Sequence, residues 1–115
     1  MEKRNFVNEV KKAWGSEEWI VDKHYCGKFL NINAGHQTSL HYHDKKAETF
    51  FVLKGRVMVD DGNKNIILNE GDIFDISPNQ LHRATALTDV KIIEFSTQHD
   101  ENDGHRMEFG GKADR

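Results

Sequence analysis

The sequence predicts a single all-β domain, either a β-sandwich or a small β-barrel, on three observations. The chain has 115 residues, a length that suits one domain with a modest core. From residue 19 onward, short apolar or alternating segments recur between turn residues. Hardly any of these segments repeats with the period of an α-helix. Many short strands with this spacing are typical of sandwiches and barrels.

The N-terminal part is expected to differ from the rest. Residues 1–12 place Phe6, Val7 and Val10 among charged residues, which predicts a short helical or irregular arm that packs on the body. The C-terminal GGKADR has the composition of a mobile end. The chain therefore divides into an arm (1–18), a β-barrel domain (19–109) and a flexible tail (110–115).

The strands are expected from their local patterns, taken in chain order. Asp61–Gly62 is a strong signal for the tight turn of a hairpin, and Pro78 separates two later strands. The expected segments are EWIVDKHY (18–25), GKFLNINAG (27–35), TSLHYH (38–43), ETFFVLKG (48–55), the hairpin RVMVDDGNKNIIL (56–68), two strands within 71–87, and DVKIIEFST (89–97).

Composition excludes several classes of protein. The longest apolar runs are far too short to span a membrane, and the first residues lack the apolar stretch of a secretory signal. The net charge of −3 gives no basic field for nucleic acid. The single cysteine, Cys26, rules out an intrachain disulfide and suits a reducing compartment. We therefore expect a cytoplasmic protein with neither a nucleic-acid nor a membrane partner.

The segment SLHYHDKKAETFFVLKG (39–55) gives the strongest chemical signal. His41 and His43 are one residue apart on a predicted strand, so their side chains point to the same side. A turn at DKKA then brings Glu48 opposite them, at the start of an apolar strand where an unpaired carboxylate would be costly. Two imidazoles and a carboxylate predict a site for a divalent transition metal. His82, in a second segment of similar shape, is the best candidate for a further ligand.

These residues resemble the two motifs of the cupin superfamily. The first motif is a glycine, an HxH pair, a glutamate and a second glycine at fixed intervals, and the second runs from a glycine to a histidine. The resemblance covers about residues 27–96. It implies a double-stranded β-helix, which is a jelly-roll-like barrel, with one divalent metal per chain (Zn, Mn, Fe or Ni) on the two histidine motifs. The matching residues are Gly35, His41, His43, Glu48 and Gly55, then Gly71 and His82.

The second motif departs from the family pattern at three places. Ser77 stands where a proline is expected, with Pro78 one position later, and Asn79 replaces a turn glycine. Asparagine tolerates the left-handed backbone region better than most residues, so we expect the turn to survive. Ala86 stands in place of the final asparagine, which removes a contact around the ligands but no ligand.

A narrower resemblance is to the cupin domain of type II mannose-6-phosphate isomerases. It implies a metal-dependent aldose–ketose isomerase, or an epimerase, acting on a sugar or sugar phosphate, and hence a small carbohydrate as partner. Two other classes stay open. One is a non-enzymatic sugar-binding or regulatory cupin, and the other is an iron-dependent dioxygenase with the same four ligands. The comparable residues are Trp14, Gly15, Arg83, Glu94, Asp103 and Arg106.

Isomerisation needs a base and an acid beside the metal. Glu94 is the candidate base, because it shares a strand face with two apolar residues and should look into the barrel. Cations near the site would bind a phosphate or polarise a carbonyl. The expected catalytic residues are Glu94, Lys46 and Arg83, and the expected substrate-binding residues are Arg106, His36 and His105, the two histidines because they flank strand ends.

Each of these residues also has a purely structural interpretation. Arg83 follows His82 on its strand and faces the other way, where it could form a salt bridge. Glu94 could pair with a buried cation, Lys46 could be a solvated turn residue, and Arg106 could bond a neighbouring carboxylate. By the same alternation Tyr42 should face away from the metal.

An exposed edge strand would be a liability for a small barrel. Small cupins usually pair through their barrel edges. We therefore expect a homodimer.

Overall fold

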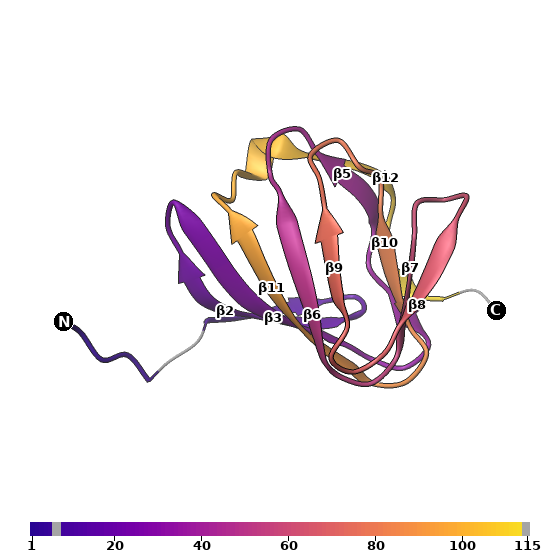
Figure 1. Cartoon of the computed structure of the whole chain (residues 1–115), viewed down its shortest axis with the longest axis horizontal. Helices are drawn as coiled ribbons and strands as arrows, with labels where there is room; N and C mark the ends of the chain where they lie inside the picture. Colours follow the sequence, from indigo (N-terminus) through magenta and orange to yellow (C-terminus); the bar gives the residue numbers. More distant parts are fainter. Residues whose placement is uncertain (6–7, 114–115) are drawn as a thin grey trace.

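The computed structural model describes residues 1–5 and 8–113, and this part of the chain is built almost entirely of antiparallel strands (Figure 1). A short 3₁₀ helix, η1 (Glu101–Asp103), precedes the last two strands. The strands are β1 (Asn8–Lys12), β2 (Gly15–Asp22), β3 (Tyr25–Ile32), β4 (His36–Gln37), β5 (Leu40–His43), β6 (Glu48–Lys54), β7 (Val57–Asp60), β8 (Asn65–Leu68), β9 (Ile73–Ile76), β10 (Arg83–Ala86), β11 (Val90–Thr97), β12 (Gly104–Glu108) and β13 (Gly111–Lys112).

The strands form three hydrogen-bonded groups. A six-stranded sheet has the order β1-β2-β3-β11-β6-β9, a five-stranded sheet has the order β13-β4-β10-β7-β8, and β12 pairs with β5. In Figure 1 the strands β2, β3, β11, β6 and β9 lie side by side, β10, β7 and β8 lie beyond β9, and β5 with β12 lies near the top of the view. Most neighbours in the sheets are far apart in sequence, so the fold is a jelly-roll-like sandwich whose sheets do not close on each other. The prediction of an all-β domain is confirmed.

The inner face of the six-stranded sheet is apolar at one end and charged at the other. Leu30 and Ile32 of β3 and Ile92 of β11 point inward, and Ile32 and Ile92 are almost fully buried. The next inward residues on the same strands are Lys28 and Glu94, which are opposite each other across the β3–β11 pair. Both are buried as well. The alternation that builds the core therefore also brings charged side chains into the interior.

The N-terminal part differs from the expected helical or irregular arm in residues 8–12, which are a strand. Residues 8–12 form β1, which pairs with β2 at the edge of the six-stranded sheet, while Phe6 and Val7 lie outside the described residues. Gly15 begins β2 where a Cβ atom would lie 1.9 Å from the backbone oxygen of Asn31. Cross-strand pairing explains the strand, because it overrides a weak local helical pattern.

The chain beyond residue 109 also departs from the expected flexible tail. Gly111 and Lys112 form β13 and pair with β4. Ala113 is buried, and its N–H donates to the backbone oxygen of Gly35 at 2.7 Å. Residues 114–115 lie outside the described residues.

Two predicted turns are confirmed. Gly62 has φ +90° between β7 and β8, as the hairpin requires. Asn79 has φ +67° in the turn before β10, so asparagine does replace the motif's glycine there. Its N–H donates to the backbone oxygen of His43 at 2.6 Å. None of the helices in the described residues has the length and apolar character to cross a membrane.

Candidate metal centre

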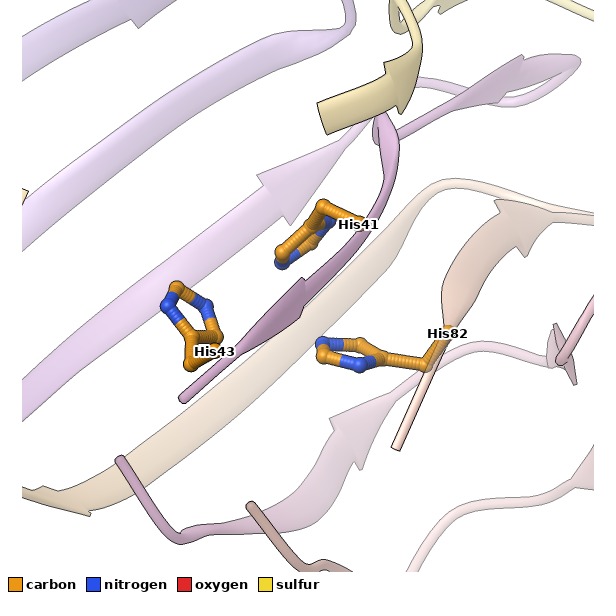
Figure 2. Close-up of side chains that lie close together, drawn as sticks. All are labelled: His41, His43 and His82. Carbon is orange, nitrogen blue, oxygen red and sulfur yellow. The ribbon is translucent and has the colours of Figure 1, made fainter. Parts of the chain in front are cut away.

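Three histidines from the two predicted motifs lie together. His41 and His43 come from β5, and His82 immediately precedes β10. The backbones of His41 and His82 exchange two hydrogen bonds of 3.1 and 2.9 Å, which fix the two motifs side by side. Figure 2 shows the three imidazole rings turned toward a common space, and a ring nitrogen of each lies within 4.8 Å of the others. We call these residues the histidine trio.

Hydrogen bonds assign the ring nitrogens that are free to bind a metal. Nδ1 of His41 lies 2.8 Å from the backbone oxygen of Ser39, and Nδ1 of His82 lies 2.9 Å from that of Gln80. Each Nδ1–H therefore donates to a carbonyl and leaves Nε2 with its lone pair. Nε2 of His82 and Nδ1 of His43 are buried without a hydrogen-bond partner. Three converging rings, two of which carry an unpartnered buried nitrogen, fit a divalent transition metal.

Glu48 lies beside the trio and not within it. Its Oε2 is 3.2 Å from Nε2 of His82 without the geometry of a hydrogen bond, and its Oε1 is 3.1 Å from Nζ of Lys46. The Glu48 side chain is only 3% exposed. The carboxylate can thus keep Lys46 on one oxygen and offer the other to a metal, so its role as fourth ligand stays a prediction.

Burial keeps two of the three histidine side chains neutral. It lowers the pKa of His41 to about 4, helped by the charge of His82, and it also lowers the pKa of His43. Burial opposes protonation of His82 too, but the neighbouring Glu48 outweighs it, so the pKa of His82 is raised. Burial likewise opposes ionisation of Glu48, yet His82 and Lys46 hold the pKa of this carboxyl well below its usual range. At neutral pH His41 and His43 are therefore ready to bind a cation.

A row of alternating charges continues from the trio across the wall of a cavity of about 860 Å³. Nζ of Lys46 lies 3.1 Å from Glu48 and 3.2 Å from Oε2 of Glu94. Nζ of Lys28 lies 4.0 Å from the same oxygen of Glu94 and 3.3 Å from Oε1 of Glu17. The three carboxylates and both ammonium groups therefore form one chain of ion pairs on the inner face of the sheet, which we call the ion-pair row.

The row sets the acid–base character of its members. Burial acts to lower the pKa of Lys46, but the carboxylates of Glu94 and Glu48 outweigh it and raise the pKa to about 12. Burial, aided by the charge of Glu48, raises the pKa of Glu94 to about 6, although Lys28 and Lys46 both oppose the shift. Glu94 therefore titrates much closer to neutrality than an ordinary carboxyl. Such tuning is common among catalytic acids and bases.

The structure brings only some of the predicted catalytic residues to the cavity. Glu94 and Lys46 line it, and Lys46 is only 3% exposed, so it is no solvated turn residue. Arg83 lies on the far side of its strand and does not line the cavity. Its guanidinium donates to Glu108 at 2.8 Å and to the backbone oxygens of Thr38 and Phe109. Arg83 therefore ties β12 and the chain after it to the body of the fold.

The predicted substrate-binding residues also separate. Arg106 is exposed, lines the cavity and is opposite His41 in the β5–β12 pair, so it shares the face of the trio. His105 is opposite Tyr42, stacks on its ring at 4.8 Å and lies 2.7 Å from Asp44 through Nε2. His105 also lines the cavity, but its side chain packs with Tyr42 and Asp44 on the face of β5 opposite to His41. His36 lies on β4 and does not line the cavity.

Sequence patterns missed two charged residues of the row. Lys28 is in phase with two buried apolar residues of β3, and this is a signal that a lysine points inward. Glu17 gives no such signal, because its partner Lys28 is known only once β2 and β3 are paired. The family resemblance pointed to Asp103, but the sequence did not predict the hydrogen bonds that its side chain makes. Its carboxylate accepts hydrogen bonds from the backbone N–H groups of Lys45 and Lys46, at 2.9 to 3.2 Å.

Comparison with known proteins identifies relatives of this fold. The family model described as a cupin domain matches residues 28–96, more than half of the chain. Mannose-1-phosphate guanylyltransferase RfbM of Salmonella typhimurium is 29% identical over 105 residues, which cover 83% of this chain and 22% of that protein. The chain thus spans about a fifth of the length of the curated relative it matches.

Solved structures agree on the fold. The capsular polysaccharide assembling protein CapF from Staphylococcus aureus aligns with a TM-score of 0.74 at 18% identity, over 89% of this chain and 34% of CapF. Oxalate decarboxylase from Bacillus subtilis, a protein with Mn(II) centres, aligns with a TM-score of 0.73 at 18% identity, over 88% of this chain and 30% of that one. At such identities the likeness concerns the fold alone.

Proposed function

The chain belongs to the cupin domain family, and from that premise we propose that it is a metal-dependent isomerase or epimerase of a sugar or sugar phosphate. The observation that supports this most is the position of Glu94. A buried carboxyl with a raised pKa faces the same cavity as three metal-competent histidines, and one lysine connects it to Glu48. A proton-transfer group and a Lewis-acid site side by side are what carbonyl–enediol chemistry requires.

The metal would be held by the histidine trio through the free ring nitrogens, with Glu48 as the fourth ligand. A divalent ion in this place would polarise a substrate carbonyl and so acidify the adjacent C–H bond. The Nδ1 bonds of His41 and His82 to backbone carbonyls fix the orientation of those two rings. We propose only that the ion is a divalent transition metal.

Glu94 would move the proton. Both recorded contacts of its carboxylate, to Lys46 and to Lys28, involve Oε2, so Oε1 is the oxygen left to act. This oxygen takes the proton from the carbon next to the carbonyl, the electrons of that C–H bond form a C=C bond, and the π electrons of the carbonyl move to its oxygen, which gives an enediolate. When the hydroxyl proton of the neighbouring carbon passes to that oxygen and Glu94 returns its proton to the former carbonyl carbon, an aldose becomes a ketose. Epimerisation requires a proton delivered to the original carbon from the opposite face, by a second acid or after the intermediate turns in the site.

Lys46 would keep the charges of this step in balance. It contacts Glu48 at 3.1 Å and Glu94 at 3.2 Å, so its ammonium group lies between a metal ligand and the base. When Glu94 gains a proton, Lys46 remains paired with Glu48. The lysine therefore stabilises the site in both protonation states of the base.

A carbohydrate substrate is supported by the names of two related proteins. RfbM is a mannose-1-phosphate guanylyltransferase, and CapF is a capsular polysaccharide assembling protein. Arg106, the exposed cation on the face of the trio, is the candidate for holding an anionic group of the substrate. We also retain the homodimer and the cytoplasmic location as proposals.

The test is proton NMR of the zinc- or manganese-loaded protein in D₂O with a panel of aldoses and their phosphates, led by mannose 6-phosphate. The expected result is conversion to the ketose with deuterium entering at the reacting carbon. The chelator-treated protein and the Glu94→Gln variant should both lose this activity. The Lys91→Met variant, changed on the outer face of the sheet, should keep it.

One observation favours a second candidate, a sugar-binding cupin without catalysis. Both buried carboxylates near the trio, Glu48 and Glu94, are already paired with lysines, which a purely structural ion-pair row would also explain. Firm metal binding without conversion or deuterium uptake across the panel would refute the isomerase. Oxygen consumption by the iron-loaded protein would then point to the dioxygenase.

A further inference from the structure

A second polar cluster lies in the cavity, one strand beyond Glu94. It consists of Glu17 and Trp19 on β2, Lys28 on β3 and His99 after β11, and we call it the β2–β3 cluster. All four residues line the cavity. The side chains of Lys28 and Glu17 are 6% and 13% exposed. Neither the metal site nor the proton transfer proposed above uses this cluster.

Its members hold one another in place. Lys28 and Trp19 are opposite each other in the β2–β3 pair, and Nζ of Lys28 lies 4.2 Å from the centroid of the indole. Oε1 of Glu17 accepts a hydrogen bond from Nε1 of Trp19 at 3.1 Å and lies 3.3 Å from Nζ of Lys28. His99 packs edge-on against Trp19 at 5.2 Å. The cluster is therefore preorganised.

The cluster also has polar atoms to spare. Within the described residues, the structure records no partner for Oε2 of Glu17, and Nδ1 of His99 is buried without one. The ammonium group of Lys28 has three donors, and only Glu17 is recorded within hydrogen-bond distance of it. Buried polar groups are normally hydrogen-bonded. A free acceptor and free donors on a cavity wall indicate a place where a ligand completes the bonding.

The types of these groups indicate the class of ligand. A carboxylate oxygen accepts from hydroxyl groups, an ammonium group donates to them, and the edge of an indole offers apolar surface to C–H groups. Together they match a polyhydroxylated carbon chain or ring. Buried ion pairs often add no stability over apolar residues of the same size, so a role in ligand binding is a reason for this pair to be present.

The position of the cluster relates it to the reaction. Lys28 lies 4.0 Å from Oε2 of Glu94, so the hydroxyls next to a carbon that reacts at Glu94 come within reach of Lys28 and Glu17. We propose that the β2–β3 cluster is the subsite for the non-reacting hydroxyls of a carbohydrate, with Lys28 as a specificity-determining residue. This inference rests on the proposed function for its substrate class.

The other face of the same sheet provides a matched control. Lys91 on β11 lies 3.3 Å from Glu18 and 4.5 Å from the ring centroid of Phe29. The outer group thus repeats the contacts of Lys28 with Glu17 and Trp19, but Lys91 does not line the cavity. The Lys91→Met variant therefore loses the same kinds of contact as Lys28→Met without touching the subsite.

The experiment titrates D-mannitol, a hexitol that has no carbonyl group and cannot isomerise, into zinc-loaded ¹⁵N-labelled protein. The readout is the indole N–H resonance of Trp19, assigned with the Trp19→Phe variant. We expect a saturable shift in the wild type and in Lys91→Met, and at least tenfold weaker binding in Lys28→Met. Glu17→Gln keeps the size of the side chain and should weaken mannitol binding as well. It tests the subsite even if Lys28→Met does not fold.

Two results would overturn the subsite. One is the absence of a saturable Trp19 shift in the wild type, and the other is equal mannitol affinity in Glu17→Gln and Lys91→Met. These outcomes are separate from the fate of the isomerase. Mannitol binding at Trp19 without conversion of any aldose would uphold the subsite and remove the isomerase. Conversion of an aldose without mannitol binding would remove the subsite alone.

Discussion

Removing the carboxylate of Asp103 should loosen the metal site from a distance. Asp103 ends η1, is 5% exposed, and accepts backbone hydrogen bonds from Lys45 at 2.9 and 3.2 Å and from Lys46 at 3.1 Å. In addition, its backbone oxygen accepts from the N–H of Asp44 at 3.1 Å. These bonds fix the turn between His43 and Glu48, so the carboxylate positions His43, Lys46 and Glu48 although it is not one of the candidate ligands.

The magnitude follows from the bonds that are lost. A hydrogen bond to a charged group contributes about 1.5–3 kcal/mol, and leaving a buried N–H without a partner is costly. Asp103→Ala removes the acceptor for two N–H groups, of which that of Lys46 is buried, so we expect a loss of about 3 kcal/mol in the free energy of unfolding. Asp103→Asn keeps one oxygen and should lose about 1–2 kcal/mol. Loss of such a positioning contact should weaken zinc binding about 10- to 100-fold.

Two measurements check this prediction. Urea unfolding of the chelator-treated protein gives the free energy, and competition with a chromophoric chelator gives the zinc affinity. The control is Asp75→Ala, an exposed aspartate whose Oδ1 accepts from Thr49 Oγ1 at 2.8 Å. It should change stability by less than about 0.5 kcal/mol. The reasoning fails if Asp103→Ala is as stable as the control, or if it is destabilised but binds zinc as tightly as the wild type.

Four further predictions address the charged residues directly. Lys46→Met leaves two buried carboxylates without their cation, so urea unfolding at neutral pH should show a loss of about 3–5 kcal/mol; wild-type stability would contradict the ion-pair row. The pKa of His41 is about 6.5 in the unfolded chain and about 4 in the fold, so the unfolded chain binds more protons between these values. Titration of His41 alone should therefore cost the metal-free protein about 3 kcal/mol as the pH falls from 6.5 to 4, measured as the difference in pH dependence between the wild type and His41→Asn. His82→Ala should lower zinc affinity by more than about 100-fold in equilibrium dialysis, and unchanged affinity would exclude it as a ligand. Arg83→Met should leave zinc affinity unchanged but lower the free energy of unfolding by about 1–3 kcal/mol, because the guanidinium gives up three hydrogen bonds and leaves two backbone oxygens without them.

Local patterns were enough to predict the histidine trio. His41 and His43 are on one strand, where alternation fixes their common direction, and the spacing of the second motif points to His82. The turn conformation of Asn79 was equally a local property. The side-chain directions and the turn conformation of these residues depend on neighbours within a few positions along the chain.

Long-range pairing decided the features that the sequence did not predict. Lys28 meets Glu94 because β3 pairs with β11, and it meets Glu17 because β3 pairs with β2. Lys46 is buried because Asp103 holds the backbone of its turn against the C-terminal segment. The strand β1, where a helical or irregular arm was expected, has the same origin, since the edge of the sheet offers β1 a partner that a local pattern does not reveal.

The two backbone bonds between His41 and His82 have a consequence for the exchange of ions. They fasten the two motifs by protein alone, so an ion can depart and another can enter while the strands stay joined. An ion bound at the trio could then be stripped and replaced by another without unfolding the chain. Because three imidazoles suit several divalent ions, availability would weigh beside ligand type and geometry in which of them is bound.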